Sequence, residues 1–377
     1  MIVTFPHMGN VFIPMKALLD DMGVESVIPP FSTRATLEMG ARYAPEGACL
    51  PLKITVGNLM EGRALGADTM VMLGAWGPCR FGYYCQMQQE VLSEAGCPMR
   101  AIILEACAEG FRESVRRAAR LFGGLAIPRL IRGLRAFTIL TLGVDRLERL
   151  YRHTKTRELR RGEADRIYRG FRREAFHTRG SARMLSLLHD AESALGRVDT
   201  DEAARPLRIG IVGEIYGTID PFMNLELESR LCAMGVAVER LVTISDWLVE
   251  HILKKAFRLP RDLRFAEAAA PYLGMDIGGH TRETIGHTVM HAREGYDGII
   301  QLYPLGCMPE IVAQSILPRV IADMDIPVLT LIYDEHTGEA GYITRLEAFL
   351  DLLIQRRASG AGAPGAAASI KECGGTV

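Results

Sequence analysis

The sequence predicts an α/β protein that contains two Rossmann-like parallel-sheet domains joined by a basic helical segment. The first observation behind this prediction is a pattern that occurs four times: an apolar strand, a turn that contains glycine or proline, an amphipathic helix and a second apolar strand. The second is a change in charge and periodicity between the second and third copies. Strand–helix–strand units imply parallel sheets with right-handed crossovers, so we expect two such sheets.

The four units occupy residues 2–30, 69–106, 208–241 and 298–335. The helices of the first three units end in a glycine, as a left-handed C-terminal cap requires. The units fall into two groups along the chain. This grouping predicts an N-terminal domain over residues 1–110 and a C-terminal domain over residues 206–355, with a candidate site in the cleft between them.

The segment between the two domains, residues 111–205, has a helical pattern and is strongly basic. Residues 111–190 contain 20 Lys and Arg against 8 Asp and Glu. This composition is typical of a solvated helical linker or subdomain, or of a surface for an acidic partner or for substrate phosphates. The tail, residues 356–377, is rich in glycine and alanine and is expected to be disordered.

Composition excludes several classes of protein. The net charge of −1 provides no argument for a nucleic-acid or membrane partner. No basic stretch followed by an apolar one marks a signal peptide at the N-terminus. The most apolar central stretch carries Arg129, Arg132 and Arg135, which argues against a membrane span. Eight cysteines in such a chain are expected to be reduced thiols or metal ligands, and we expect a cytoplasmic protein.

Three cysteines occupy positions where parallel sheets bind ligands, beyond the carboxyl ends of the strands. Cys79 and Cys307 follow the first strands of the second and fourth units, and Cys49 lies just before Pro51, which suits the first turn of a helix. We expect each helix N-terminus to lower the pKa of its thiol and to stabilise the negative charge of an iron–sulfur cluster. Zinc also accepts thiolates, but the CxxC pairs of structural zinc sites are absent.

The other cysteines leave alternatives open. Cys85 lies about one turn inside the predicted helix of the second unit, where it is either a fourth cluster ligand or a buried core residue. Cys97, Cys107 and Cys232 are typical of core or loop thiols, and Cys373 lies in the tail. A thiol enzyme with Cys79 as nucleophile is a further hypothesis, although no Cys–His pairing is visible to activate it.

Polar residues near the same strand ends are further candidates. Glu214 and Tyr216 follow the first strand of the third unit, and His336 follows the last strand of the fourth. Each is either a proton-transfer group in the cleft or a structural residue of its turn. Lys53 and Arg80 lie beside cysteines, where they offset cluster charge, contact a phosphate of a cofactor or substrate, or form surface salt bridges.

A predicted helix is rich in histidine, and two common nucleotide-binding motifs are absent from the sequence. The spacing of His280, His287 and His291 places them on one helical face, where they could bind zinc or pack as core residues. The core role is favoured, because the acidic residue that usually accompanies such histidines in a zinc site is absent. Neither GxGxxG nor GxxxxGK[ST] is present, so nothing in the sequence supports a dinucleotide or P-loop site.

Five motifs together carry a family resemblance: ACLPLK, GPCRFG, GEIYGTIDP, YPLGCMPE and DEHTGEAGYITRLEAF. With them the chain resembles the 2-hydroxyacyl-CoA dehydratase D-component (2-hydroxyglutaryl-CoA dehydratase-like) family, in its activase-related, CoA-protein-activase-like branch. The resemblance extends from residue 1 to about residue 355 and is least distinctive in the basic segment.

The resemblance implies an oxygen-sensitive iron–sulfur cluster between α/β domains, with Cys49, Cys79 and Cys307 as ligands. It implies a [4Fe-4S] cluster or, by similarity to other relatives, a double-cubane [8Fe-9S] cluster. Electrons would come from an ATP-hydrolysing activator protein of actin-like fold, for radical chemistry on an acyl-CoA by a dehydratase or reductase component, and homo- or heterodimers would be expected. A non-catalytic electron carrier is the alternative.

Overall fold

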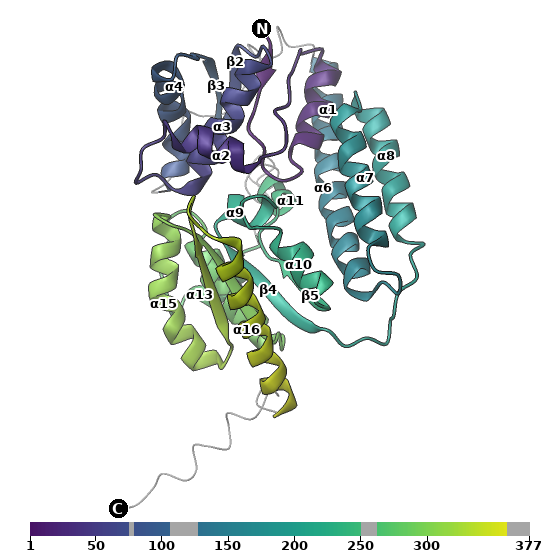
Figure 1. The fold of residues 1–377 in the computed structure, drawn as a ribbon, viewed down its shortest axis with the longest axis vertical. Helices are drawn as coiled ribbons and strands as arrows, with labels where there is room; N and C mark the ends of the chain where they lie inside the picture. Colours follow the sequence, from purple (N-terminus) through teal and green to yellow (C-terminus); the bar gives the residue numbers. More distant parts are fainter. Residues whose placement is uncertain (75–78, 106–126, 250–261, 360–377) are drawn as a thin grey trace, which may run out of the picture.

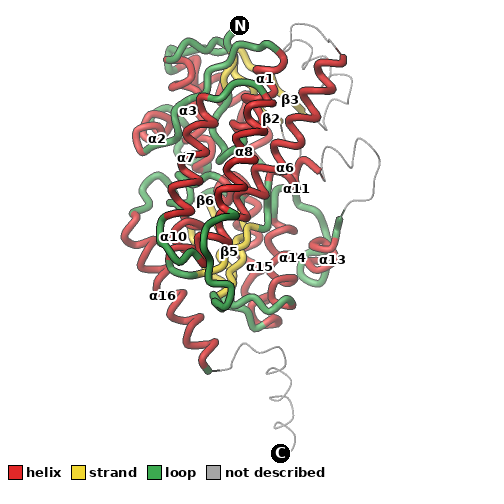
Figure 2. The backbone as a smooth tube through the Cα atoms, turned by 90° about the vertical axis from the view of Figure 1, so that its right-hand side faces the viewer, coloured by secondary structure: helices red, strands yellow, loops and turns green. Residues whose placement is uncertain are grey.

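The computed structural model describes residues 1–74, 79–105, 127–249 and 262–359 (Figure 1). Within these ranges the chain is a mixed α/β structure with two separate parallel sheets, which confirms the predicted class. The sheets lie one above the other along the long axis, and a layer of helices runs beside them (Figure 1 and Figure 2). The predictions for Cys107, Cys373 and residues 360–377 of the tail fall outside the described residues, whereas residues 356–358, expected to be disordered with that tail, form the last turn of a helix, because the preceding helix continues through Arg356 and Arg357.

The N-terminal sheet has the order β1-β2-β3, with all strands parallel: β1 (Val3–Thr4), β2 (Thr69–Gly74) and β3 (Arg100–Glu105). Its helices are α1 (Phe12–Met22), α2 (Arg34–Ala41), α3 (Leu50–Ala64) and α4 (Tyr84–Glu94). The second strand expected for the first unit is reduced to one bridge between Val3 and Ser26. Pro29 and Pro30 follow directly and lack the N–H groups that further pairing needs.

The basic segment forms three long helices, α6 (Ile127–Arg157), α7 (Glu163–His177) and α8 (Ser181–Leu195), which we call the helical layer. This layer packs against α1 (Figure 1). Phe12 of α1 shares one buried core with Leu140, Phe171 and Met184 of the three long helices. The helical layer is therefore joined to the N-terminal part of the chain by a common core.

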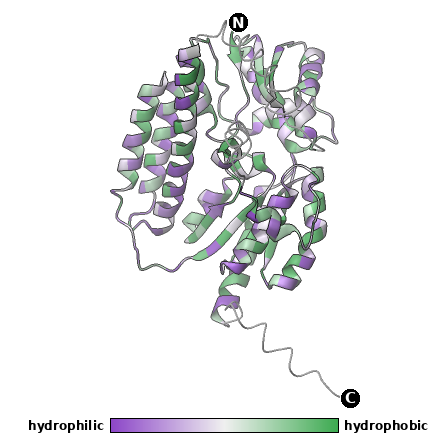
Figure 3. Ribbon diagram, turned by 180° about the vertical axis from the view of Figure 1, so that it is seen from behind, coloured by the Kyte–Doolittle hydropathy of each residue, from purple (hydrophilic) through white to green (hydrophobic). Residues whose placement is uncertain are grey.

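The C-terminal sheet has the order β5-β4-β6-β7, again all parallel: β4 (Leu207–Gly213), β5 (Val236–Arg240), β6 (Gly298–Pro304) and β7 (Val328–Tyr333). Its helices are α9 (Ile215–Ile219), α10 (Leu227–Ala233), α11 (Ile244–Trp247), α13 (Arg264–Ala269), α14 (Thr281–Arg293), α15 (Met308–Met324) and α16 (Glu339–Ala358). Apolar side chains concentrate in the strands, whereas the helices are mixed (Figure 3).

The helix predicted for the third unit, over residues 222–235, is shortened to α10, which begins at Leu227, and the turn before it contains the additional short helix α9. Pro221 follows α9, and Leu225 and Glu226 both adopt left-handed φ values, 54° and 56°. These residues interrupt the helical hydrogen-bond ladder that periodicity alone predicted.

Within the described ranges, no helix has the length and apolar character needed to cross a membrane.

Candidate functional site

Cys49, Cys79 and Cys307 each occupy the N-cap position of a helix. Cys49 precedes α3, Cys79 precedes the short 3₁₀ helix η1 (Arg80–Tyr83) that leads into α4, and Cys307 precedes α15. All three have extended backbone conformations, with φ of −69°, −66° and −73°. Cys79 comes after β2 and Cys307 after β6, so the two parallel sheets direct their carboxyl edges toward one region.

Arg80 connects the three cysteine loops. It follows Cys79 directly, and its Nη1 donates a hydrogen bond of 3.1 Å to the carbonyl oxygen of Gly47, two residues before Cys49. Its Nη2 donates one of 2.5 Å to the carbonyl oxygen of Gly306, the residue before Cys307. Gly306 has a φ of +80°, a conformation that favours glycine. One exposed guanidinium therefore holds the loops from both sheets together.

The contact between the sheets is also close on the side of α14. A Cβ atom placed on Gly279 would lie 2.4 Å from Cγ of Pro309 and 3.8 Å from Cβ of Cys79. With a φ of +62° in addition, position 279 accepts only glycine without a shift of its neighbours. The start of α15 and the Cys79 loop approach each other at this point.

Burial raises the pKa of all three thiols. Cys49 and Cys307 are 7 % and 5 % exposed. Desolvation raises the pKa of Cys49 to about 12, and it also raises the pKa values of Cys79 and Cys307, which the neighbouring carboxylate of Glu214 raises further. This differs from the sequence-based expectation of lowered values, because loss of water outweighs the helix N-termini. The thiols therefore stay protonated unless a metal ion displaces the protons.

Hydroxyl and carboxyl groups near the cysteines come from four residues: Tyr84, Glu310, Glu214 and Tyr333. The hydroxyl of Tyr84 lies 2.5 Å from Sγ of Cys49. Glu310, three residues after Cys307, is fully buried; its carboxylate accepts hydrogen bonds from Gln301 and Thr284, and burial raises its pKa to about 8. Sequence reasoning missed both residues. Glu310 is the last residue of the YPLGCMPE motif and Tyr84 lies two residues after GPCRFG, so closeness to these motifs was the available signal.

Glu214 and Tyr333 form the remaining part of this region. Glu214 caps α9 by accepting the N–H groups of Tyr216 and Gly217, and burial raises its pKa to about 7. A Cβ atom on Gly217 would lie 1.8 Å from the hydroxyl oxygen of Tyr333, so glycine permits this approach. That hydroxyl is buried without a hydrogen-bond partner. Sequence reasoning also missed Tyr333, whose apolar surroundings on β7 suggest a core residue.

Three other residues were predicted for the site, and each has a different set of contacts: Tyr216, Lys53 and His336. Tyr216 donates its hydroxyl hydrogen bond to the carbonyl oxygen of His7, in the contact between the two sheet regions. Lys53 pairs with Glu335 and donates to the carbonyl oxygen of Glu46. His336 is exposed in a turn, where its N–H donates to Asp334.

Cys85 lies among apolar side chains. It is 1 % exposed and shares a core with Met70, Met72 and Leu92, whereas Cys49 belongs to a different core with Tyr84. This position is the one expected if Cys85 is a core residue.

The remaining candidates are dispersed. Cys97 is partly exposed after α4, and burial raises the pKa of Cys232 on α10 to about 11. On α14, His291 is buried and His287 is half-buried, with ring centroids 6.4 Å apart. In the part of the chain that the structure describes, no three His, Cys, Asp or Glu side chains are grouped as ligands of a metal ion.

The fold and this region define a class of protein: a two-sheet α/β chain with cysteine-capped helices at facing sheet edges. The family model described as CoA enzyme activase uncharacterised domain matches residues 7–241, more than half of the chain. The chain therefore belongs to this family, which confirms the predicted relation to activase-type CoA enzymes at that level. The match includes Cys49, Cys79 and Glu214, and Cys307 lies beyond it. No curated protein matches the chain.

Proposed function

We propose that the protein is an iron–sulfur component of a CoA-dependent reductive system, with Cys49, Cys79 and Cys307 as cluster ligands. It would receive low-potential electrons from an ATP-hydrolysing activator protein and use them on an acyl-CoA. The observation that carries the proposal is the Arg80 bridge, which gathers three N-capping cysteines from two sheets into one region.

The residues present fit such a cluster in their chemistry. Thiolate sulfur is the usual protein ligand of iron–sulfur clusters, and three thiolates at helix N-termini suit the negative charge that a cluster brings. The raised pKa values of Glu214 and Glu310 favour their neutral forms near pH 7, which limits repulsion between these carboxyl groups and the cluster. When bound, the cluster would supply one-electron transfer.

The chain's own groups would position and protect this centre. Arg80 brings a positive charge to the cysteine loops, and the Tyr84 hydroxyl orients the sulfur of Cys49. Glu214 and Glu310 are buried carboxyl groups able to hold a proton near pH 7. Lys53 and Glu335 join α3 to the loop after β7 and so limit the separation of the two sheet regions.

One observation favours the second candidate, a non-catalytic electron carrier. Cys49 and Cys307 are almost fully buried, and none of the three cysteines lines the cavity that reaches His7 or the one that reaches Arg240, in the described part of the chain. An enclosed centre suits transfer of electrons better than binding of an acyl-CoA. A domain movement that opens the cysteine region would restore the enzyme alternative.

Iron and acid-labile sulfide per chain, measured after strictly anaerobic purification, test the proposal. About four of each, with an EPR signal after reduction, are expected for a [4Fe-4S] cluster, and about eight iron and nine sulfide for the double-cubane alternative. Cys49→Ser, Cys79→Ser and Cys307→Ser should each lose most of the iron. Cys232→Ser is the matched control, a buried cysteine on α10, and should keep it. Wild-type protein without iron, or full iron in all four variants, would refute the cluster.

The carrier and the enzyme are then distinguished by turnover. The reduced protein, supplied with an ATP-dependent activator, is mixed with acyl-CoA thioesters and the products are followed by mass spectrometry. Conversion of a thioester supports the enzyme. Reoxidation by protein acceptors without any change in thioesters supports the carrier.

A further inference from the structure

A cavity of about 340 Å³ lies where three parts of the chain meet, away from the cysteines. Its walls come from the loop regions after β1, from α7 of the helical layer, and from the turn between α9 and α10. Its volume falls in the range of small-molecule sites, roughly 300–1,000 Å³. The lining includes aromatic, aliphatic and charged side chains: Phe31, Phe222, Leu225, His7, Arg172 and Asp220.

Arg172 is the guanidinium in this wall that has no carboxylate oxygen at ion-pair distance among the described residues, and Asp220 is the carboxylate in the wall that has no such cation. Its Nε donates a 2.9 Å hydrogen bond to Oδ1 of Asn10, and its guanidinium carbon lies 4.6 Å from the centroid of the Phe31 ring. Among the described residues, no carboxylate oxygen lies within 4 Å of its guanidinium nitrogens. Two contacts thus fix the guanidinium plane while its Nη atoms keep their hydrogen-bonding capacity.

The acidic groups of the wall are already neutralised or hydrogen bonded. Glu339 pairs with Arg230, and Glu226 lies 3.8 Å from a guanidinium nitrogen of Arg169. Asp220 accepts two backbone N–H groups, one to each carboxylate oxygen. Backbone N–H groups therefore occupy the carboxylate oxygens of Asp220, while Arg172 acts on Asp220 only through the longer-range attraction of opposite charges and keeps its Nη atoms for a ligand.

The turn between α9 and α10 is strained at this wall. Leu225 and Glu226 are consecutive residues with left-handed φ values, an arrangement that side chains with a Cβ atom rarely adopt. Two hydrogen bonds stabilise the turn. Nε of Arg230 donates to the carbonyl oxygen of Leu225, and the hydroxyl of Tyr342 donates to the carbonyl oxygen of Asn224. Strain that the surroundings maintain is often found at binding sites, and both strained residues line the cavity.

His7 supplies a second unsatisfied group. It is 2 % exposed, and its Nε2 bonds the carbonyl oxygen of Pro29, while its Nδ1 has no hydrogen-bond partner. The centroid of its ring lies 5.2 Å from that of Phe31, with the two ring planes tilted by 30°, and the Phe31 ring also contacts the guanidinium of Arg172. The cavity wall therefore combines an apolar surface with polar atoms that the protein does not satisfy by itself.

We propose that this cavity binds a small organic carboxylate with an apolar body, its carboxylate on Arg172 and its apolar part against Phe31, Phe222 and Leu225. A guanidinium fork and a carboxylate match in charge and geometry. The site is separate from the cysteine region: Asp220 follows α9 at its C-terminal end, whereas Glu214 caps its N-terminal end. The proposal does not depend on the iron–sulfur function.

Calorimetric titration with phenylacetate and phenylacetamide tests the site, because the two probes share a ring and differ in charge. Wild-type protein should bind phenylacetate about tenfold or more tightly than the amide. Arg172→Gln should remove that preference. The control is Arg173→Gln, the exposed neighbour on α7, which should leave it unchanged.

Several results would overturn the proposal. One is the absence of measurable phenylacetate binding to wild-type protein, and another is equal affinity for acid and amide. A loss of preference in Arg173→Gln as large as in Arg172→Gln would show only a general charge effect. If Arg172→Gln fails to fold, the difference between the affinities of wild-type protein for phenylacetate and phenylacetamide still tests the proposal. The measured quantity is the heat of binding of the two probes, so the result does not depend on whether the protein holds an iron–sulfur cluster.

Discussion

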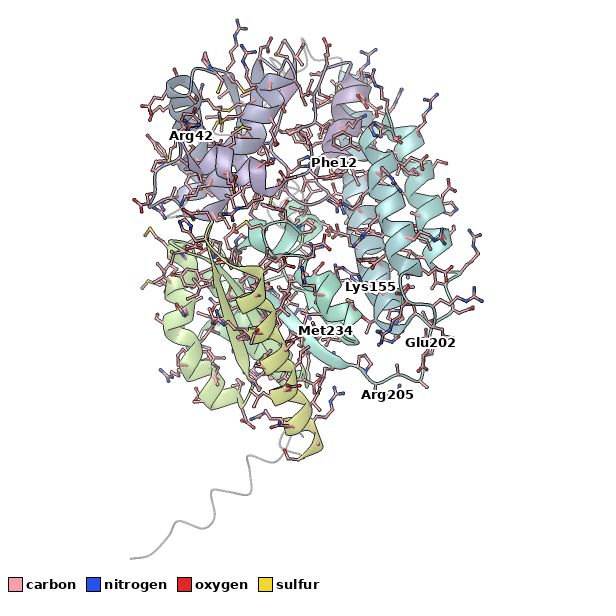
Figure 4. All side chains as sticks on the ribbon, viewed as in Figure 1. Phe12, Arg42, Lys155, Glu202, Arg205 and Met234 are labelled. Carbon is pink, nitrogen blue, oxygen red and sulfur yellow. The ribbon has the colours of Figure 1, made fainter. Side chains whose placement is uncertain are left out.

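The C-terminal sheet region is joined to its two neighbours in different ways. Toward the helical layer it uses buried charges: Arg240 on β5 pairs with Glu148 on α6, and Arg152 donates a 3.2 Å hydrogen bond to Glu228 on α10. Lys155, labelled in Figure 4, donates to Ser229 of the same helix. The side chains of Arg240 and Glu148 are only 3 % and 9 % exposed.

Toward the N-terminal sheet the polar links include two buried bonds, from Tyr216 to His7 and from Gly9 to Asp220, and a more exposed bridge at the cysteine loops. That bridge is Arg80, an exposed residue that bonds two backbone carbonyl groups, whereas the Lys53–Glu335 pair, with side chains 4 % and 19 % exposed, is about as buried as the Arg152–Glu228 pair, with 6 % and 20 %. Apolar packing of α3 against the C-terminal core supports this junction. The comparison suggests that the helical junction is permanent and that the cysteine-bearing junction is the one able to open.

Arg240→Met should produce the largest effect, because it leaves the buried carboxylate of Glu148 without its main partner. Burial alone would raise the pKa of Glu148, and the nearby guanidinium of Arg240 lowers it below its ordinary value. Removing one member of a buried pair costs about 3–5 kcal/mol. Urea unfolding monitored by circular dichroism measures the loss of unfolding free energy.

Arg146→Met is the control for that substitution. Arg146 also lies on α6 and pairs with Glu192, but its side chain is 67 % exposed. Exposed pairs contribute roughly 0–1 kcal/mol, so a much smaller loss is expected. Equal losses in both variants would remove the distinction between buried and exposed charges on which the comparison depends.

His7 should make the N-terminal junction sensitive to mild acid. Burial lowers its pKa from 6.5 to about 4. Between these values the unfolded chain binds a proton that the folded chain does not, so stability is present above pH 6.5 and falls as the pH drops toward 4. The lowered pKa of Glu148 acts in a lower window, below 4.5, so the two junctions respond at different pH.

The measurement is the pH dependence of urea unfolding between pH 7 and pH 5. His7→Gln should reduce the slope by up to roughly 1.4 kcal/mol per pH unit, the contribution of one proton. His336→Gln, at an exposed position, serves as control and should leave the slope as in wild type. An unchanged slope in His7→Gln would contradict the assignment of this acid response to His7.

The parts of the fold predicted from sequence are those that local patterns determine. Seven of the eight expected strands formed, because apolar runs bounded by glycine and proline need only local information. The late start of the helix of the third unit, at Leu227, was not predicted, because the left-handed residues 225 and 226 lie in a turn that the hydroxyl of Tyr342, distant in sequence, stabilises through the carbonyl oxygen of Asn224. The shared core of α1 with α6–α8 likewise depends on long-range packing.

The candidate site also combines features that local sequence patterns determine with features that depend on long-range packing. The N-cap positions of Cys49, Cys79 and Cys307 follow from strand ends and prolines, so they were predictable. The raised thiol pKa values were not, because burial is a property of the assembled chain. Glu310 was missed for a similar reason: a glutamate in the first turn of a helix is usually exposed, and here tertiary contacts bury it.

Lys53→Met should have the smallest effect and addresses the cysteine junction directly. The amine of Lys53 binds Glu335 and the carbonyl oxygen of Glu46, so its loss should let the two sheet regions separate more often. We expect a cost of about 1 kcal/mol, hence roughly fivefold faster hydrogen–deuterium exchange in peptides that span Cys49 and Cys307. Arg63→Met, an exposed residue on the same helix, should change neither peptide. Faster exchange in the helical-layer peptides instead would place the opening at the junction that we describe as permanent, and would reverse the comparison.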